Sequence, residues 1–272
     1  MEIKTLICDL DGTLLAPSGG VLVSDRVRDA LIPLQEQGMT IVLASARIFQ
    51  GVLPLARQLQ MDRYHGYIIA QNGTLGYDVS RDQTLFVHAI EQTDSLALWE
   101  MARQMGLDFG IAQPSYMVAS GYSEGFALDR YNCAVDYLLT DTPQRYVREE
   151  IWKCSASGDK ATVDRSFDRF RTQVEARYPY RVIRSTDTFV DVIRQGCDKA
   201  GGLKELFAQI GGSFAQAAAI GDGDSDTQMI RESAWGVTLE NGSALCKRHA
   251  KQIVPSYEQE GCLTLFSQLL SR

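Results

Sequence analysis

The sequence lacks the long apolar runs that membrane and secreted proteins need. No apolar stretch in its 272 residues reaches the roughly 20 residues of a membrane-spanning helix. Its first residues, MEIKTLICDLDG, place charges where a secretory signal needs an apolar segment. We therefore expect a cytoplasmic protein with no membrane partner.

The sequence also lacks an excess of basic residues. Its formal net charge is −7, whereas nucleic-acid binders usually present a basic face, so we expect no nucleic-acid partner. With 45% hydrophobic and 22% charged residues, the composition is that of a globular protein with one large core or two modest ones. An acidic protein that acts on an anion needs a local cation, which points to a metal ion and a few placed Lys or Arg side chains.

Cysteine and histidine are sparse and scattered. No C-x-x-C pair occurs, which indicates reduced, packed thiols rather than a disulfide framework or a zinc site. The three histidines are far apart, which disfavours a metal site built from histidine. The cysteines are Cys8, Cys133, Cys154, Cys197, Cys246 and Cys262, and the histidines are His65, His88 and His249.

Strand and helix patterns alternate along the first part of the chain. Ser24 is a plausible N-cap for the first helix, and Gly38 a plausible stop. Alternation of this kind predicts an α/β fold with a parallel, Rossmann-like sheet. The predicted elements are a strand at 5–8, a helix at 24–37, a strand at 40–44, a helix near 49–60 and a strand at 67–70.

The pattern changes after about Gly76 and returns after Val190, Asp191 and Val192. In between, a hairpin around 80–83 and helices near 93–105 and 159–177 predict a separate α+β unit. Beyond it, the pattern predicts helices from about Asp198 and Ser225 and strands at 217–220 and 236–239. We therefore predict a core domain formed by residues 1–78 and 188–272, with an α+β domain inserted at 79–187.

Two acidic motifs follow predicted strands of the core. Asp9 and Asp11 lie two residues apart, so one can act as nucleophile or metal ligand while the other transfers a proton. An Asx-type turn closed by Gly12 would have the same residues without any catalytic role. The segment from Ile220 to Thr227 places three acids within five residues, which repel one another unless a cation compensates. A magnesium site with oxygen ligands fits this loop, whereas an EF-hand does not.

Two weaker signals accompany them. Ser45 directly follows the strand at 40–44 and can donate to a phosphate oxygen, or it can cap a helix. Lys199 lies at the start of a helix, where a cation is unfavourable to the helix dipole. It can neutralise a phosphate, or it can be an ordinary solvated lysine.

In order and placement, the four motifs resemble those of the haloacid dehalogenase superfamily. The matching segments are residues 9–13, Ser45, Lys199 and residues 221–226. The insertion, Asn72–Gly73 and Asn241 are similar to the Cof-type branch, subclass IIB, whose members carry an α+β cap and commonly hydrolyse small phosphate esters. This chain departs from the common pattern at Ser45, Ala46 and Ser225, where Thr, Gly and Asn are frequent, and none of these changes removes a catalytic group.

The resemblance implies a Mg²⁺-dependent phosphatase of small phosphorylated metabolites such as sugar phosphates. It makes Asp9 the nucleophile that forms an aspartyl phosphate, and Asp11 the general acid and base. Ser45 and Lys199 would hold the phosphoryl oxygens. The implied magnesium ligands are the Asp9 carboxylate, the Asp11 backbone carbonyl and Asp222, with Asp226 in support.

Two other functions stay open on the sequence alone. A phosphomutase would use the same Asp9 and Asp11 but protect the phosphoenzyme from water. A non-enzymatic receiver-type switch would also use an acidic pocket, a hydroxyl and a Lys, but receivers are shorter and have no cap. Either a monomer or a small homo-oligomer is compatible with the sequence.

Overall fold

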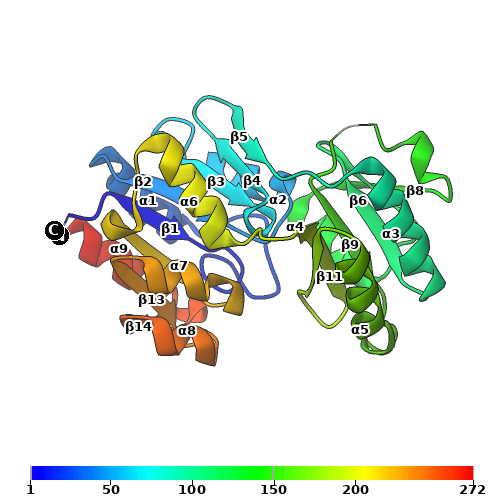
Figure 1. Ribbon diagram of the computed structural model, residues 1–272. Helices are drawn as coiled ribbons and strands as arrows, with labels where there is room; N and C mark the ends of the chain where they lie inside the picture. The colour runs from blue at the N-terminus through cyan, green and yellow to red at the C-terminus, as the bar shows by residue number, and fades with distance from the viewer. Residues whose placement is uncertain (1, 149, 272) are drawn as a thin grey trace. The chain divides into compact units, whose positions relative to one another are not determined.

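The computed structural model describes residues 2–148 and 150–271, which form two compact units. The core unit consists of Met1–Arg47, Val52–Phe86 and Asp198–Arg272. The inserted unit consists of Ile48–Gly51 and Val87–Cys197. Each unit is built around a sheet of its own (Figure 1).

The core unit contains an eight-stranded sheet in the order β14-β13-β12-β1-β2-β3-β4-β5. Neighbouring strands from β14 to β3 run parallel, and β4 pairs antiparallel with β3. The predicted α/β class is therefore confirmed. The strands are β1 (Thr5–Cys8), β2 (Thr40–Ala44), β3 (Tyr67–Ala70), β4 (Leu75–Asp78), β5 (Gln83–Val87), β12 (Ala217–Gly221), β13 (Trp235–Leu239) and β14 (Gln252–Val254).

Helices cover the core sheet. On one face, Leu203 and Phe207 of α6 and Met229 of α7 pack against a cluster that includes Ile7 of β1 and Val42 of β2. Elsewhere in this unit α1 lies against α9. The helices are α1 (Asp25–Glu36), α2 (Phe49–Gln58), α6 (Lys199–Ile210), α7 (Thr227–Glu232), α8 (Ala244–His249) and α9 (Cys262–Leu270). The short 3₁₀ turns of this unit are η1 (Gln71–Gly73), η3 (Phe214–Gln216), η4 (Asp224–Asp226) and η5 (Tyr257–Gln259), whereas η2 (Pro143–Arg145) lies in the inserted unit.

Capping side chains fix the starts of α1 and α6 in the core unit. Ser24 Oγ accepts the Val27 N–H at 3.2 Å and begins α1. Asp198 Oδ1 accepts the Gly201 N–H at 2.7 Å and begins α6. Such caps satisfy amide groups that have no partner within the helix, and they set where α6 presents its first residue, Lys199.

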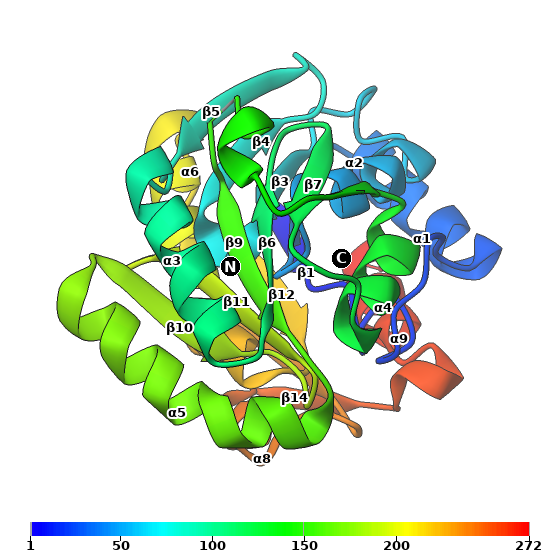
Figure 2. The same ribbon diagram turned by 90° about the vertical axis from the view of Figure 1, so that its right-hand side faces the viewer.

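The inserted unit contains a six-stranded sheet in the order β10-β11-β9-β6-β7-β8. Trp99 of α3 and Phe170 of α5 pack on one face of this sheet, against Phe109 and Val190, and the two helices lie side by side there (Figure 2). Phe126 of α4 packs in a separate cluster. The elements are β6 (Asp108–Ala112), β7 (Tyr116–Ala119), β8 (Asp136–Leu139), β9 (Lys153–Ser157), β10 (Tyr180–Arg184), β11 (Phe189–Arg194), α3 (Gln92–Gln104), α4 (Glu124–Cys133) and α5 (Lys160–Arg177).

The bounds of the two compact units differ from the predicted domain bounds where the chain enters and leaves the long inserted segment, and the short segment Ile48–Gly51 also groups with the inserted unit. The hairpin around 80–83 joins β4 to β5 and extends the core sheet, because β4 turns back directly onto β3. Val190, Asp191 and Val192 lie in β11, which pairs with β9 and β10 of the inserted sheet rather than returning to the core. The crossings therefore fall later in the chain, at Phe86/Val87 and at Cys197/Asp198.

Two further observations bear on the class of protein. All six cysteines are buried free thiols. Within residues 2–148 and 150–271, no helix has the length and apolar character needed to cross a membrane.

Candidate active site

The candidate site begins where the central strand β1 ends. The strand is fully buried between β12 and β2, and the chain leaves it at Asp9, whose N–H donates to the Ile220 carbonyl at 3.0 Å. Asp9 is itself buried. Gly12 then adopts a φ of +83°, and its N–H donates to the Leu15 carbonyl at 2.9 Å. This left-handed turn is one that glycine adopts without strain.

Lys199 joins Asp9 to the acidic loop. Its Nζ lies 2.6 Å from Asp9 Oδ1 and 2.6 Å from Asp226 Oδ1, and the residue is only 2% exposed. Burial alone would lower the pKa of Lys199, but the Asp226 and Asp9 carboxylates raise it above its ordinary value. Lys199 is therefore a buried cation beside Asp9 rather than a solvated surface lysine.

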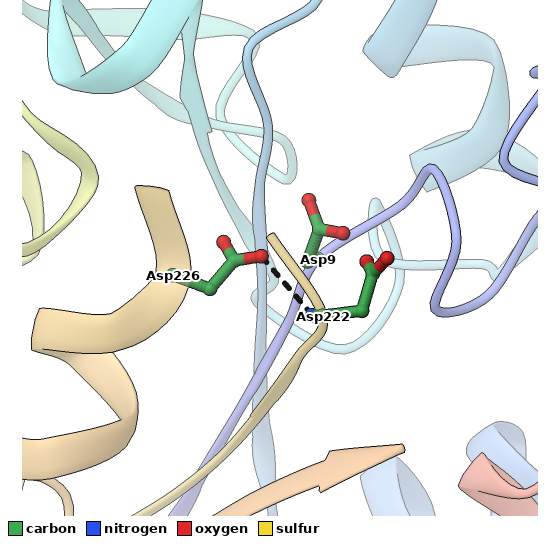
Figure 3. Close-up of side chains that lie close together, drawn as sticks. All are labelled: Asp9, Asp222 and Asp226. Carbon is green, nitrogen blue, oxygen red and sulfur yellow. Dashed lines mark hydrogen bonds between the residues drawn. The ribbon is translucent and has the colours of Figure 1, made fainter. Parts of the chain in front are cut away.

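Asp226 organises the loop that carries it. Its Oδ2 accepts the N–H of Asp222 at 3.2 Å, drawn as a dashed line in Figure 3, and the N–H of Gly223 at 2.9 Å. Its other oxygen is bound by Lys199. Both oxygens of Asp226 thus have donors from the protein itself, which suits a residue that shapes the site more than one that offers a free ligand.

Asp222 and Asp9 share a single hydroxyl group. Thr13 Oγ1 lies 3.0 Å from Asp222 Oδ1 and 3.1 Å from Asp9 Oδ2, yet its one proton can serve only one of them. Burial, together with the negative charges of Asp9 and Asp226, raises the pKa of Asp222 to about 7. Burial and Asp226 likewise raise the pKa of Asp9, while Lys199 opposes the rise.

These carboxylates fit a divalent cation. Asp9, Asp222 and Asp226 each offer an oxygen, and the three oxygens lie within 4.8 Å of one another (Figure 3). Lys199 supplies one positive charge against three negative ones. Burial is the main cause of the raised pKa values of Asp9 and Asp222, and repulsion between the carboxylates adds to it, so a bound cation would favour their charged forms. Carboxylate oxygens are the ligands that Mg²⁺ prefers. The donor set therefore fits the predicted metal, with Asp9 and Asp222 as the side chains that would hold it.

Ser45, Arg47 and Asp11 form a second group at the same edge of the sheet. Ser45 follows β2, is buried, and accepts the Arg47 N–H on its Oγ at 3.1 Å, which leaves its own proton for an incoming acceptor. Arg47 Nε lies 2.8 Å from Asp11 Oδ2, and its Nη2 lies 2.5 Å from Asp11 Oδ1. Asp11 is thus held by an arginine that the sequence argument did not include in the site.

A strained turn, η1, is hydrogen-bonded to the backbone of Ser45 and Arg47. Gln71 and Asn72 in η1 are buried, with φ values of 55° and 54°, a conformation that costs a non-glycine residue about 1 kcal/mol or more. The Gln71 N–H donates to the Arg47 carbonyl at 3.0 Å, and the Asn72 N–H donates to the Ser45 carbonyl at 3.1 Å. The same turn packs against the start of α6. It therefore links the Ser45 segment to the helix that carries Lys199.

Asn241 is a further residue of the site. Its Nδ2 donates to the Gly12 carbonyl at 2.8 Å and lies 3.4 Å from Asp222 Oδ2, and its Oδ1 accepts the Tyr257 N–H at 2.9 Å. The sequence relates Asn241 to the site only through the family resemblance. Its side chain ties the turn after Asp9 to the loop that contains Asp222.

The structure therefore brings the predicted residues together in two linked sets. Asp9, Lys199, Asp222 and Asp226 form one network of contacts, and Ser45 and Asp11 are connected through Arg47. Residues that sequence reasoning missed are Thr13, Arg47 and Gln71, although the first two lie within or beside the quoted motifs. The roles of the predicted residues remain predictions.

This fold and this cluster define an α/β enzyme whose site consists of carboxylates around one buried lysine. The chain belongs to the family described as haloacid dehalogenase-like hydrolases, whose model matches residues 6–266. The predicted family and the prediction of a hydrolase are confirmed.

Individual relatives resemble the chain over nearly its whole length. A haloacid dehalogenase-like hydrolase from Bacteroides thetaiotaomicron superposes with a TM-score of 0.90 at 26% identity, covering 98% of this chain and 100% of its own. A phosphoglycolate phosphatase of Pyrobaculum aerophilum is 27% identical, covering 93% of this chain and 90% of its own. The 5-amino-6-(5-phospho-D-ribitylamino)uracil phosphatase of Bacillus subtilis is 22% identical, covering 96% of this chain and 93% of its own.

Proposed function

We propose that this chain is a Mg²⁺-dependent phosphatase that hydrolyses a small phosphate monoester through a phosphorylated Asp9. The observation that carries the proposal is the contact of buried Lys199 with both Asp9 and Asp226. The neighbouring Asp222 carboxylate has a raised pKa beside these two acids. A carboxylate can attack an anionic phosphate only where nearby cations offset their repulsion. Lys199 is one such cation.

The proposed reaction has two displacements. An oxygen of Asp9 attacks phosphorus, the ester P–O bond breaks, and the leaving oxygen takes a proton from Asp11. Water then attacks the phosphorus, returns a proton to Asp11, and breaks the bond to Asp9, which releases inorganic phosphate. Ser45 and Lys199 bind phosphoryl oxygens throughout. Bound Mg²⁺, held by Asp9, Asp222 and the Asp11 carbonyl, would supply Lewis-acid neutralisation of the phosphoryl charge.

The substrate we propose is a small phosphorylated metabolite, such as a sugar phosphate. Relatives of this chain are named for phosphoglycolate and for a phosphoribitylamino uracil, which are both small phosphate esters but differ from each other. At 22% to 27% identity this variety supports the substrate class and not one compound. We propose that the inserted unit is the cap domain of this family and selects among such esters.

The test is phosphate release from a panel of phosphorylated metabolites, with Mg²⁺ and with excess chelator. We expect turnover that requires Mg²⁺ and is lost in Asp9→Asn, while Asp224→Asn, an exposed acid of the same loop, keeps it. Borohydride reduction during turnover should convert a phosphorylated Asp9 to homoserine, detectable by mass spectrometry. Full activity of Asp9→Asn would contradict the mechanism, and an isomerised product without free phosphate would indicate a phosphomutase.

A further inference from the structure

Arg47 is a buried arginine whose three donor nitrogens all face the loop after β1. Its Nε and Nη2 bind the two oxygens of Asp11 at 2.8 Å and 2.5 Å, and its Nη1 donates to the Gly20 carbonyl at 2.7 Å. The Arg47 side chain is 6% exposed, whereas that of Asp11 is 34% exposed. A paired guanidinium of this kind fixes both the position and the plane of a carboxylate.

The guanidinium is held independently of Asp11. The backbone of Arg47 donates to Ser45 Oγ and accepts from the Gln71 N–H, and the Gly20 contact engages a nitrogen that Asp11 does not use. The Gly20 contact and the backbone bonds therefore hold Arg47 in place without help from Asp11.

We propose that Arg47 is a positioning residue that sets the orientation of the Asp11 carboxylate for proton transfer to the leaving oxygen. This inference rests on the proposed function, in which Asp11 gives its proton to that oxygen as the ester P–O bond breaks. Arg47 itself forms and breaks no covalent bond. Its effect is on how well one oxygen of Asp11 meets the leaving group, because general acid catalysis depends strongly on that geometry.

A positioning role predicts an effect that depends on the leaving group. An aryl phosphate with a stable phenolate, such as p-nitrophenyl phosphate, needs little help from an acid. Phenyl and p-methoxyphenyl phosphate have similar shapes but poorer leaving groups, so they need the proton more. If Asp11 loses its orientation, hydrolysis of phenyl and p-methoxyphenyl phosphate should therefore slow much more than hydrolysis of p-nitrophenyl phosphate.

The experiment measures kcat/KM for these three aryl phosphates with Mg²⁺, since this parameter covers the step in which the leaving group departs. We expect Arg47→Met to lower kcat/KM by roughly 100-fold for p-methoxyphenyl phosphate, but by less than about fivefold for p-nitrophenyl phosphate. Asp11→Asn should show the same pattern more strongly. Arg47→Lys should restore little, because an ammonium cannot span both oxygens of Asp11.

Arg28→Met is the matched control, because Arg28 also uses Nε and Nη2 on one carboxylate, that of Asp29, on the exposed side of α1. It should leave all three rates unchanged. Thermal unfolding shows whether each variant is folded, and Arg47→Lys keeps the charge if Arg47→Met is unstable.

Equal loss for all three aryl phosphates in both Arg47 variants would overturn the inference, because that pattern indicates a structural or phosphate-binding role. Failure of the proposed function looks different: the unmodified protein would release no phosphate, or Asp9→Asn would stay active.

Discussion

Replacing Gly12 with alanine tests whether the turn after Asp9 shapes the proposed metal site. A Cβ at Gly12 would lie 2.7 Å from Asp222 Cγ and 2.8 Å from Asp222 Oδ1, far inside van der Waals contact. The backbone cannot easily retreat, because the Gly12 carbonyl is bound by Asn241 and its N–H by Leu15. The Asp222 carboxylate is therefore the group that has to move.

Gly12→Ala should have two separate effects, one on folding stability and one on metal affinity. At a φ of +83° alanine costs about 1–2 kcal/mol in folding stability, because its Cβ crowds the following carbonyl. Displacement of Asp222 adds a loss of metal affinity, which we expect to be about 10- to 100-fold by analogy with changes that misorient metal ligands. Isothermal titration of the metal-free protein with Mg²⁺ measures the second cost, and chemical denaturation with chelator present measures the first.

Gly38→Ala separates these two costs. Gly38 has a φ of +90°, and among the described residues no heavy atom lies within 4 Å of a Cβ placed there. Gly38→Ala should therefore lose the same 1–2 kcal/mol of stability but bind Mg²⁺ normally. If Gly12→Ala also binds Mg²⁺ normally, Asp222 is not a ligand whose position depends on this turn, and the reasoning is refuted.

Three further predictions concern charge in the same site. Lys199→Met should destabilise the metal-free protein by about 3–5 kcal/mol at neutral pH, because it leaves Asp9 and Asp226 buried without their cation. Lys204→Met, which removes an exposed lysine from the same helix, should cost far less in the same denaturation assay. Because a proton competes with a cation for Asp222, whose pKa is about 7, calorimetry should find Mg²⁺ affinity rising from about pH 6 to about pH 8. Because the pKa of Asp222 is raised in the folded state, its contribution to stability is present at low pH and is lost as pH rises through about 7. The unfolding temperature measured with chelator should therefore fall over this pH range. Saturating Mg²⁺ should make the fall smaller.

Much of the core could be predicted from local sequence. The strands at 5–8, 40–44 and 67–70 have the predicted bounds, because short apolar runs between turn signals fix buried parallel strands. Ser24 caps the first helix as expected, since its hydroxyl has only to reach an amide three residues ahead. Local signals of this kind need no knowledge of the rest of the chain.

The unit boundaries could not be predicted in the same way. The local pattern predicts a buried strand at Val190, Asp191 and Val192, and such a strand fits either sheet. Which sheet it joins depends on residues far away in the sequence. In the structure, Asp191 is buried, and its Oδ1 lies 2.6 Å from Nζ of Lys153, a residue of β9 in the inserted sheet. Nothing in the local pattern identifies that lysine as its partner.

The same limit applies to Arg47. The sequence places it two residues after Ser45, but only the fold shows that its guanidinium meets Asp11, 36 positions earlier in the chain. A charged residue beside a motif is most often solvated, so its neighbours in sequence gave no reason to include it. Thr13 was missed for a similar reason, because a hydroxyl in a turn has many possible partners.

The two cations of the site explain how neighbouring carboxylates can have different tasks. Asp9 and Asp11 are two residues apart, yet Lys199 contacts Asp9 and Arg47 contacts Asp11. Lys199 is a compact charge buried beside a second acid, which suits the proposed attack of Asp9 on a negatively charged phosphate. Arg47 is a planar fork beside a partly exposed carboxylate, which suits the proposed role of Asp11 as a group that keeps its orientation while it transfers a proton. This division predicts that exchanging the two cations, as Lys199→Arg with Arg47→Lys, impairs both the attack by Asp9 and the proton transfer by Asp11, even though the net charge of the site is unchanged.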